Sequence, residues 1–182
     1  MKPWQKDLRI LAAVVAAALV AAAAVNEHPF YNLMFRLGLY DRAAVKQNIE
    51  LTLRQFNRDF ATLFNVAGPR AVLGAIQADN LIKRRIIQEV TFWDGKNMVM
   101  VYDKDTFNIE KIELQRPDRA IVVAREIWYI SAQDAATRRP VSTLKRNPER
   151  IRYLMRMVGG KWQIMEFEVY GENDSIPAEV RP

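Results

Sequence analysis

The longest apolar run of the chain lies near its N-terminus. Residues 10–25 read ILAAVVAAALVAAAAV, directly after the basic stretch MKPWQKDLR. Cations followed by an unbroken apolar segment are typical of a chain delivered to a membrane insertion machine. The pattern fits an uncleaved single-pass anchor, which we favour, or a signal peptide cleaved near Ala22–Ala24. A buried alanine-rich helix of a soluble protein is the third alternative.

An aromatic segment follows the apolar run. Residues 26–40 include Phe30, Tyr31 and Phe35, which we expect to lie at the bilayer surface as an aromatic belt. Cations that precede a membrane segment are retained on the cytoplasmic side. We therefore predict an inner (plasma) membrane protein that spans once, with its N-terminus in the cytoplasm. The rest of the chain then lies in the periplasm or outside the cell.

Helical periodicity begins after Asp41, which suits an N-cap. Apolar side chains recur every three or four residues from Val45 to Ala67, and Gly68-Pro69 ends this helix. We place the polar residues of the segment away from the apolar face, namely Lys46, Glu50, Arg54, Asn57 and Arg58. A weaker helical pattern covers residues 70–87, and Asp79-Asn80 divides it.

Strand signals begin near Val90. Trp93-Asp94-Gly95-Lys96 lies between β-prone runs and predicts a hairpin with an exposed indole, because Asp-Gly favours a tight turn. Residues 108–114 alternate between apolar and polar with one slip. Residues 120–130 are rich in β-branched and aromatic side chains. Pro117-Asp118 predicts the turn between these two strands.

The last predicted elements form a hairpin. Residues 131–148 are polar and basic and predict a long loop. Residues 150–158 and 161–170 alternate as strands around Gly159-Gly160, a hairpin signal. We predict that the tail, residues 171–182, is disordered. Helices followed by antiparallel strands indicate an α+β fold, with the helices covering one face of the sheet.

The closing hairpin carries a resemblance. The segment from Ile151 to Tyr170 contains Gly-Gly-Lys-Trp-Gln-Ile at 159–164, and it resembles the last two strands of the nuclear transport factor 2-like (cystatin-like cone) superfamily. The resemblance covers residues 41–170 and implies helices packed on a curved, cone-shaped antiparallel sheet. Membrane-anchored proteins of this kind include the inner-membrane subunit of type IV secretion systems and proteins associated with mycobacterial lipid importers.

Composition excludes many chemistries. The chain has no cysteine and one histidine, His28, which removes disulfides, thiolate metal sites and multi-histidine sites. The net charge is +6, but the N-terminal segment contributes Lys2, Lys6 and Arg9 against Asp7, so the rest carries only +4. We therefore expect no nucleic-acid partner, no metal and no cofactor.

These observations predict a non-catalytic, membrane-tethered assembly or scaffolding subunit of an envelope complex, with other envelope proteins as partners and a possible homo-oligomer. One alternative is a cone protein that binds an apolar ligand or lipid. The less expected alternative is a small isomerase or hydrolase that uses Tyr102, Asp103 or Asp105 as its acid or base.

The candidate residues fall into two sets. We expect the ligand pocket, if there is one, to be lined by Tyr102, Asp103, Trp128 and Trp162. We expect partner or membrane contacts from aromatic and basic side chains, namely Phe30, Tyr31, Phe35, Trp93, Arg138 and Arg139.

Overall fold

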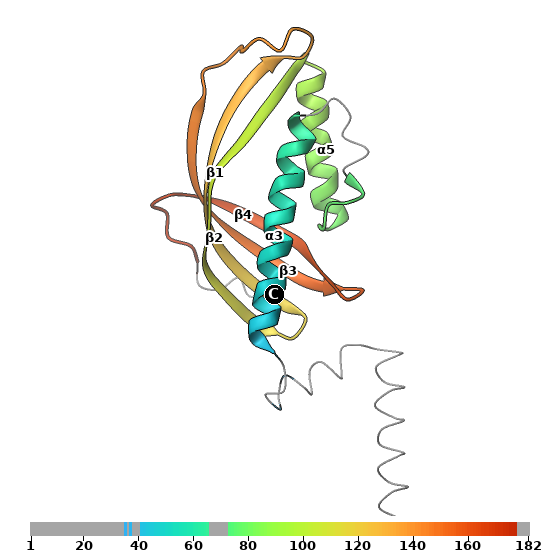
Figure 1. Cartoon of the computed structure of the whole chain (residues 1–182), viewed down its shortest axis with the longest axis vertical. Helices are drawn as coiled ribbons and strands as arrows, with labels where there is room; N and C mark the ends of the chain where they lie inside the picture. The colour runs from blue at the N-terminus through green and yellow to red at the C-terminus, as the bar shows by residue number, and fades with distance from the viewer. Residues whose placement is uncertain (1–34, 36, 38–40, 66–72, 178–182) are drawn as a thin grey trace, which may run out of the picture. The chain divides into compact units, whose positions relative to one another are not determined.

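A computed structural model describes residues 35, 37, 41–65 and 73–177 (Figure 1). Its helices and strands are, in chain order, α3 (Arg42–Asn65), α5 (Asn80–Asp94), β1 (Met98–Arg116), β2 (Arg119–Asp134), β3 (Lys145–Val158) and β4 (Lys161–Gly171). None of the helices in this part of the chain is long and apolar enough to cross a membrane. The predicted membrane segment, residues 10–25, lies outside the described residues.

The four strands form one sheet in the order β1-β2-β3-β4, so each strand pairs with the next one along the chain. The pairing is antiparallel, with Val122 opposite Tyr153 and Tyr153 opposite Phe167. Gly159 and Gly160 join β3 to β4 with φ angles of 57° and 74°. Two positive φ angles suit a tight hairpin turn. The predicted closing hairpin and its turn are confirmed.

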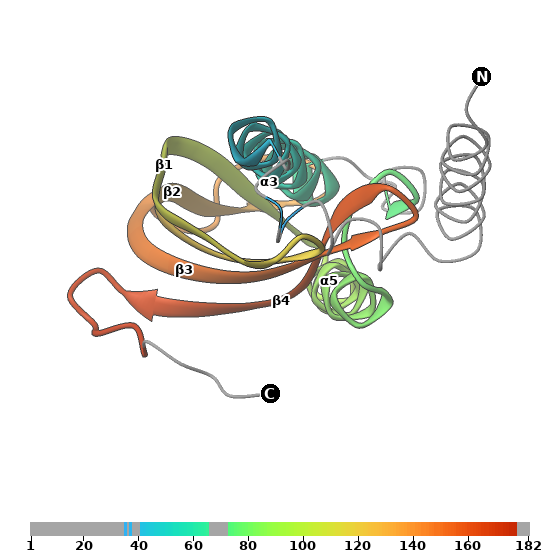
Figure 2. The same ribbon diagram turned by 90° about the horizontal axis from the view of Figure 1, so that it is seen from below.

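Two helices pack on one face of this curved sheet, which confirms the predicted α+β class. Figure 2 shows α3 lying within the curve of the strands. Fully buried side chains of the sheet meet side chains of both helices, and the core includes Ile49 and Leu53 of α3, Ile82 and Ile86 of α5, and Val122, Tyr153, Met155 and Ile164 of the sheet. Burial of these apolar surfaces supplies the main driving force for the fold.

The apolar face of α3 includes one amide, Asn57, which the helical pattern assigns to the polar side. Ile49, Leu53, Phe56 and Phe64 are buried as predicted, and Asn57 is buried among them with 3% of its surface exposed. The prediction for Asn57 was therefore wrong. A buried amide needs a hydrogen-bonding partner, and the sheet supplies one for Asn57.

The prediction of a hairpin at residues 93–96 was also wrong. Helix α5 begins after its N-cap Asp79, whose side chain accepts a hydrogen bond from the Leu81 backbone N–H, and it continues to Asp94. The helical spacing of Ile82 and Ile86 extends through Trp93, which packs against the core and not at an exposed strand tip. This packing outweighs the β-propensity of the segment, because strand propensity depends strongly on context.

The connection between β2 and β3 is shorter than predicted. Strand β2 continues to Asp134 and β3 begins at Lys145, so the connection covers residues 135–144. The Asp134 carboxylate accepts hydrogen bonds from the Thr137 backbone N–H at 2.7 Å and its hydroxyl at 2.8 Å. These bonds fix the turn that follows β2.

Residues 171–177 of the predicted tail are described. The Gly171 backbone N–H donates a hydrogen bond to the Asp174 carboxylate at 2.7 Å. Residues 178–182, the rest of the tail, lie outside the described residues.

The two edges of the sheet have different neighbours. Beside β4, the Ile164 backbone N–H donates to the Gln77 carbonyl at 3.0 Å, and the Asp79 N–H donates to the Ile164 carbonyl at 2.8 Å. The segment before α5 thus adds a short parallel bridge to this edge. Beside β1, the Asn65 side chain at the end of α3 accepts from the Tyr102 backbone N–H at 3.3 Å.

Candidate functional site

A fully buried carboxylate lies on the inner face of the sheet. Glu126 follows Val122 and Ala124 on the inward phase of β2 and has no exposed surface. Its Oε1 accepts hydrogen bonds from Tyr153 Oη at 2.6 Å and from Asn57 Nδ2 at 3.2 Å. Trp128 and Lys104 contact the other carboxylate oxygen. We call Glu126 together with its four partners, Asn57, Tyr153, Trp128 and Lys104, the Glu126 cluster.

The second oxygen of Glu126 has a neutral and a charged partner. Trp128 Nε1 donates to Oε2 at 2.9 Å, and Lys104 Nζ lies 3.0 Å from the same atom. Lys104 Nζ also lies 4.3 Å from the centre of the Phe107 ring and 4.5 Å from that of Trp128. A buried carboxylate of this kind is stabilised only by a charge partner and by hydrogen bonds to its oxygens, and Glu126 has both.

Burial changes the proton affinities around this cluster. It lowers the pKa of Lys104 from 10.5 to about 8, although the Glu126 carboxylate opposes the change. Burial also raises the pKa of Tyr153 well above its usual value, and the charge of Glu126 adds to this effect. A carboxyl on the neighbouring strand, Glu149, has a raised pKa because of its own burial. In each case desolvation disfavours the charged form of the side chain.

Tyr102 connects the inner face of β1 to both helices. Its hydroxyl donates to Glu89 Oε1 of α5 at 3.2 Å, and its ring lies 4.7 Å from that of Phe64 on α3. Burial raises the pKa of Tyr102, and the charge of Glu89 raises it further. The phenol is therefore a hydrogen-bond donor that keeps its proton at physiological pH.

The Glu126 cluster is suited to a structural role. A general base must reach a proton of its substrate, whereas Glu126 is sealed from solvent and accepts from protein donors on both oxygens. Within the described residues, no group of three or more histidine, aspartate or glutamate side chains is arranged to hold a metal ion. The chemistry of the cluster is that of an internal polar anchor between α3 and the sheet.

A groove lies next to this cluster, between α3 and β1. Its volume is about 730 Å³. Side chains of both elements line it, including Arg54, Arg58, Ala61 and Asn65 of α3 and Tyr102, Asp103, Lys104 and Phe107 of β1. The Arg54 guanidinium lies 5.0 Å from the centre of the Phe107 ring. The groove therefore combines aromatic and aliphatic walls with basic groups. We call it the α3–β1 groove.

The structure divides the predicted pocket residues. Tyr102 and Asp103 line the α3–β1 groove, and Trp128 belongs to the neighbouring Glu126 cluster. Trp162 is 4% exposed and packs in the apolar core. Its Nε1 has no hydrogen-bond partner among the described residues.

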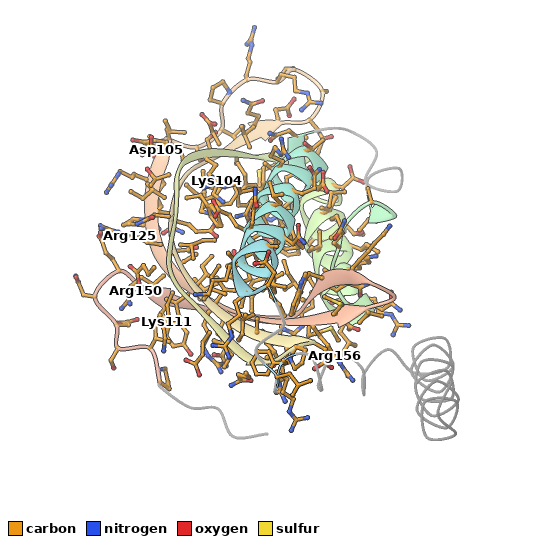
Figure 3. All side chains as sticks on the ribbon, turned by 60° about the horizontal axis from the view of Figure 1, so that its bottom comes forward. Lys104, Asp105, Lys111, Arg125, Arg150 and Arg156 are labelled. Atoms are coloured by element: carbon orange, nitrogen blue, oxygen red, sulfur yellow. The ribbon has the colours of Figure 1, made fainter. Side chains whose placement is uncertain are left out.

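The acid–base candidates do not converge on one point. Figure 3 shows Lys104 between the strand and α3, whereas Asp105 points away from them on the outer side of the sheet. The Asp103 and Asp105 side chains are exposed, and the hydroxyl of Tyr102 is bonded to Glu89.

The predicted contact residues lie in separate places. Arg138 and Arg139 are exposed on the connection between β2 and β3, and Trp93 is half-buried in the last turn of α5. The Phe35 ring lies 4.8 Å from the Arg42 guanidinium. Phe30 and Tyr31 lie outside the described residues.

Sequence reasoning missed Glu126, Lys104 and Asn57. A signal for Glu126 was present, because it occupies the same phase of the alternation as Val122 and Trp128. Asn57 has a similar signal, since it is four residues after Leu53 on α3. A polar residue at an inward position of a regular pattern indicates a buried network. Lys104 has no such signal, because the alternation of β1 slips along its length.

Comparisons with known proteins give a fold but no family. No protein family model and no curated protein matches the chain. Among the solved structures, the chain is similar to the intermembrane space region of the chloroplast protein ARC6, with a TM-score of 0.59 and 14% identity. The similarity covers 69% of this chain and 95% of that one. At this identity it shows a shared fold alone, and the resemblance to nuclear transport factor 2-like proteins stays a prediction.

Proposed function

We propose that this protein is a non-catalytic, membrane-tethered subunit of an envelope complex. In this proposal its α+β domain lies outside the cytoplasm and docks other envelope proteins. The N-terminal order of cations and apolar residues supports the tether. A tether raises the concentration of the domain near partners in the same membrane, so that modest contacts suffice for assembly.

The observation that carries the proposal is the contrast between a buried carboxylate bonded within the chain and a sheet edge that borders a groove. The oxygens of Glu126 are occupied by donors of the chain itself. By contrast, β1 borders a groove with basic and apolar walls. Exposed strand edges are frequent sites of protein association. The fold shared with an intermembrane space region is compatible with a role between membranes.

Mass measurement and crosslinking test this proposal together. We expect the native protein to be recovered from the membrane fraction at full-length mass and to resist extraction by alkaline carbonate. Crosslinking in intact cells should then join it to other envelope proteins. A soluble protein with a mass that begins near Val25 would disprove the tether.

The groove favours a second candidate function, the binding of an apolar ligand or lipid. Its volume of about 730 Å³ lies in the range of small-molecule sites. This function predicts that native mass spectrometry detects a co-purified lipid, and that Ala61→Trp, which fills the groove, removes it. Recovery of the protein without such a ligand would argue for the assembly role.

A further inference from the structure

We propose that the α3–β1 groove binds an extended, acidic peptide segment of a partner protein, which pairs with β1 at Lys104 as an added strand. This inference rests on the proposed assembly function and names the site and the partner chemistry for it. Backbone pairing, groove length and charge spacing support it independently.

Alternate residues of β1 direct their backbone N–H and C=O groups toward the groove. Tyr102 donates its N–H to Asn65 Oδ1 at 3.3 Å and accepts from Asn65 Nδ2 at 3.5 Å, so both of its backbone groups point away from β2. In an antiparallel strand, residues two apart direct their N–H and C=O groups to the same side. Lys104 therefore presents an N–H and a C=O to the groove, and neither has a partner among the described residues on that side.

The length of the groove suits an extended peptide. Its lining on α3 runs from Leu51 to Asn65, which corresponds to about 21 Å at the rise of an α-helix. A strand advances about 3.4 Å per residue, so roughly six extended residues fill this length. The amide of Asn65, which already pairs with Tyr102 as a short strand would, marks one end of the path.

The charges of the groove favour an acidic occupant. Its lining contains three cations, Arg54, Arg58 and Lys104, against one acid, Asp103. Lys104 is paired with Glu126 and Arg54 with Glu50, while none of the ion pairs among the described residues includes Arg58. Arg58 donates only to the neutral Gln55 side chain, at 2.7 Å.

The spacing of two of these cations matches a strand. Arg54 and Arg58 are one helical turn apart, so their side chains emerge about 6 Å from each other. Alternate side chains on one face of an extended peptide are about 7 Å apart. A segment with Asp or Glu at two alternate positions can therefore meet both guanidinium groups while its backbone pairs with Lys104.

Peptide selection tests the proposal. We would select random decapeptides displayed on phage against the full chain in detergent micelles. The selected peptides should carry Asp or Glu at alternate positions, and anisotropy of labelled copies would measure their binding. Arg58→Glu should weaken binding by at least about tenfold. The matched control is Arg85→Glu on α5, an exposed arginine without an ion pair among the described residues, and it should leave binding unchanged.

Backbone methylation separates strand pairing from simple charge attraction. Peptides with N-methyl groups on the edge that faces β1 should lose binding, whereas peptides methylated on the opposite edge should keep it. Selection of neutral or basic peptides would overturn the proposal. Equal binding by the Arg58→Glu variant and the wild type, or a co-purified lipid that fills the groove and blocks all peptides, would also overturn it.

The outcomes also separate this inference from the proposed function. If crosslinked envelope proteins remain bound to the Arg58→Glu variant as they do to the wild type, the assembly role stands and the groove proposal fails. If acidic peptides bind the groove but no envelope protein crosslinks to the full chain, the groove proposal stands and the assembly role fails.

Discussion

The two edge strands of the sheet differ in what lies beneath and beside them. Strand β4 pairs through Ile164 with the segment before α5, and the side chain of Ile164 is fully buried in apolar surroundings. Strand β1 has the Asn65 side chain beside it and the Glu126 cluster beneath it. One edge is thus paired at Ile164, whereas the other borders a groove.

The pairing at β4 stabilises the fold, whereas the edge of β1 remains available for pairing with another chain. A strand edge with free N–H and C=O groups invites pairing with another chain, and proteins cover or block the edges that they do not use. The segment around Ala78 pairs with β4 at Ile164. At β1, the charged wall of the groove restricts which peptide can approach, so the edge can stay open without indiscriminate association.

Removal of the buried carboxylate should have the largest effect. Glu126→Ala leaves the charge of Lys104 buried without its partner, and it leaves the Tyr153 hydroxyl and the Trp128 indole without an acceptor. We expect a loss of about 3–5 kcal/mol in the free energy of unfolding, measured by denaturant titration. Glu113→Ala, which removes the exposed partner of Lys111, is the control and should have little effect. Equal effects would show that the cluster does not stabilise the β1 side.

The core under β4 should respond next. Ile164→Ala removes a side chain with no exposed surface and leaves a cavity, so we expect a loss of about 3 kcal/mol. Ile164→Val, which removes one methylene group, should cost about 1 kcal/mol. A loss below 1 kcal/mol for Ile164→Ala would mean that the β4 edge is packed more loosely than the structure shows.

The pH dependence of stability should reveal Lys104. Its pKa of about 8 lies below the unfolded value of 10.5, so the unfolded state binds more protons between these values. Lys104 should therefore contribute a rise in stability of about 1–2 kcal/mol from pH 8 to 10, measured as the difference from Lys104→Met, because Tyr102 and Tyr153 with their raised pKa values act in the opposite direction in both proteins. In Lys104→Met this rise should be absent. Parallel curves for the two proteins would show that Lys104 is not desolvated.

The smallest effect should come from the amide that borders β1. Asn65→Ala removes two long hydrogen bonds at an exposed position, and we expect a loss of about 0.5 kcal/mol. Hydrogen exchange at the Tyr102 amide should become faster, while exchange at the Ile164 amide stays unchanged. Faster exchange at both amides would mean that the two edges open together.

Regular patterns in the sequence predicted much of the fold. Three of these patterns depend only on neighbours in the chain. They are the helical spacing around Leu53, the alternation on both sides of Gly159-Gly160 and the Pro117-Asp118 turn. The predictions were wrong where contacts between residues far apart in the chain determine the local structure. Trp93 continues α5 because its side chain packs on the core, although Asp-Gly beside it favours a turn.

Only part of the candidate site could be predicted from the sequence. Of the residues predicted to line a ligand pocket, Tyr102 and Asp103 lie along the α3–β1 groove. Arg58 was predicted only to lie on the polar side of α3. Its position opposite β1 could not be predicted, because no local pattern in the sequence indicates which strand lies beside this helix. Trp162 was grouped with the pocket, but its position on β4 places it in the core.

Local signals were enough to predict the α+β class, because hydrophobic period and turn residues act over a few positions along the chain. The folded chain brings Glu126, Lys104 and Asn57 together, and it leaves β1 beside a basic groove while β4 pairs at Ile164 with the segment around Ala78. The contact between Asn57 and Glu126 alone joins residues 69 positions apart, and packing between elements, not local preference, selects such contacts.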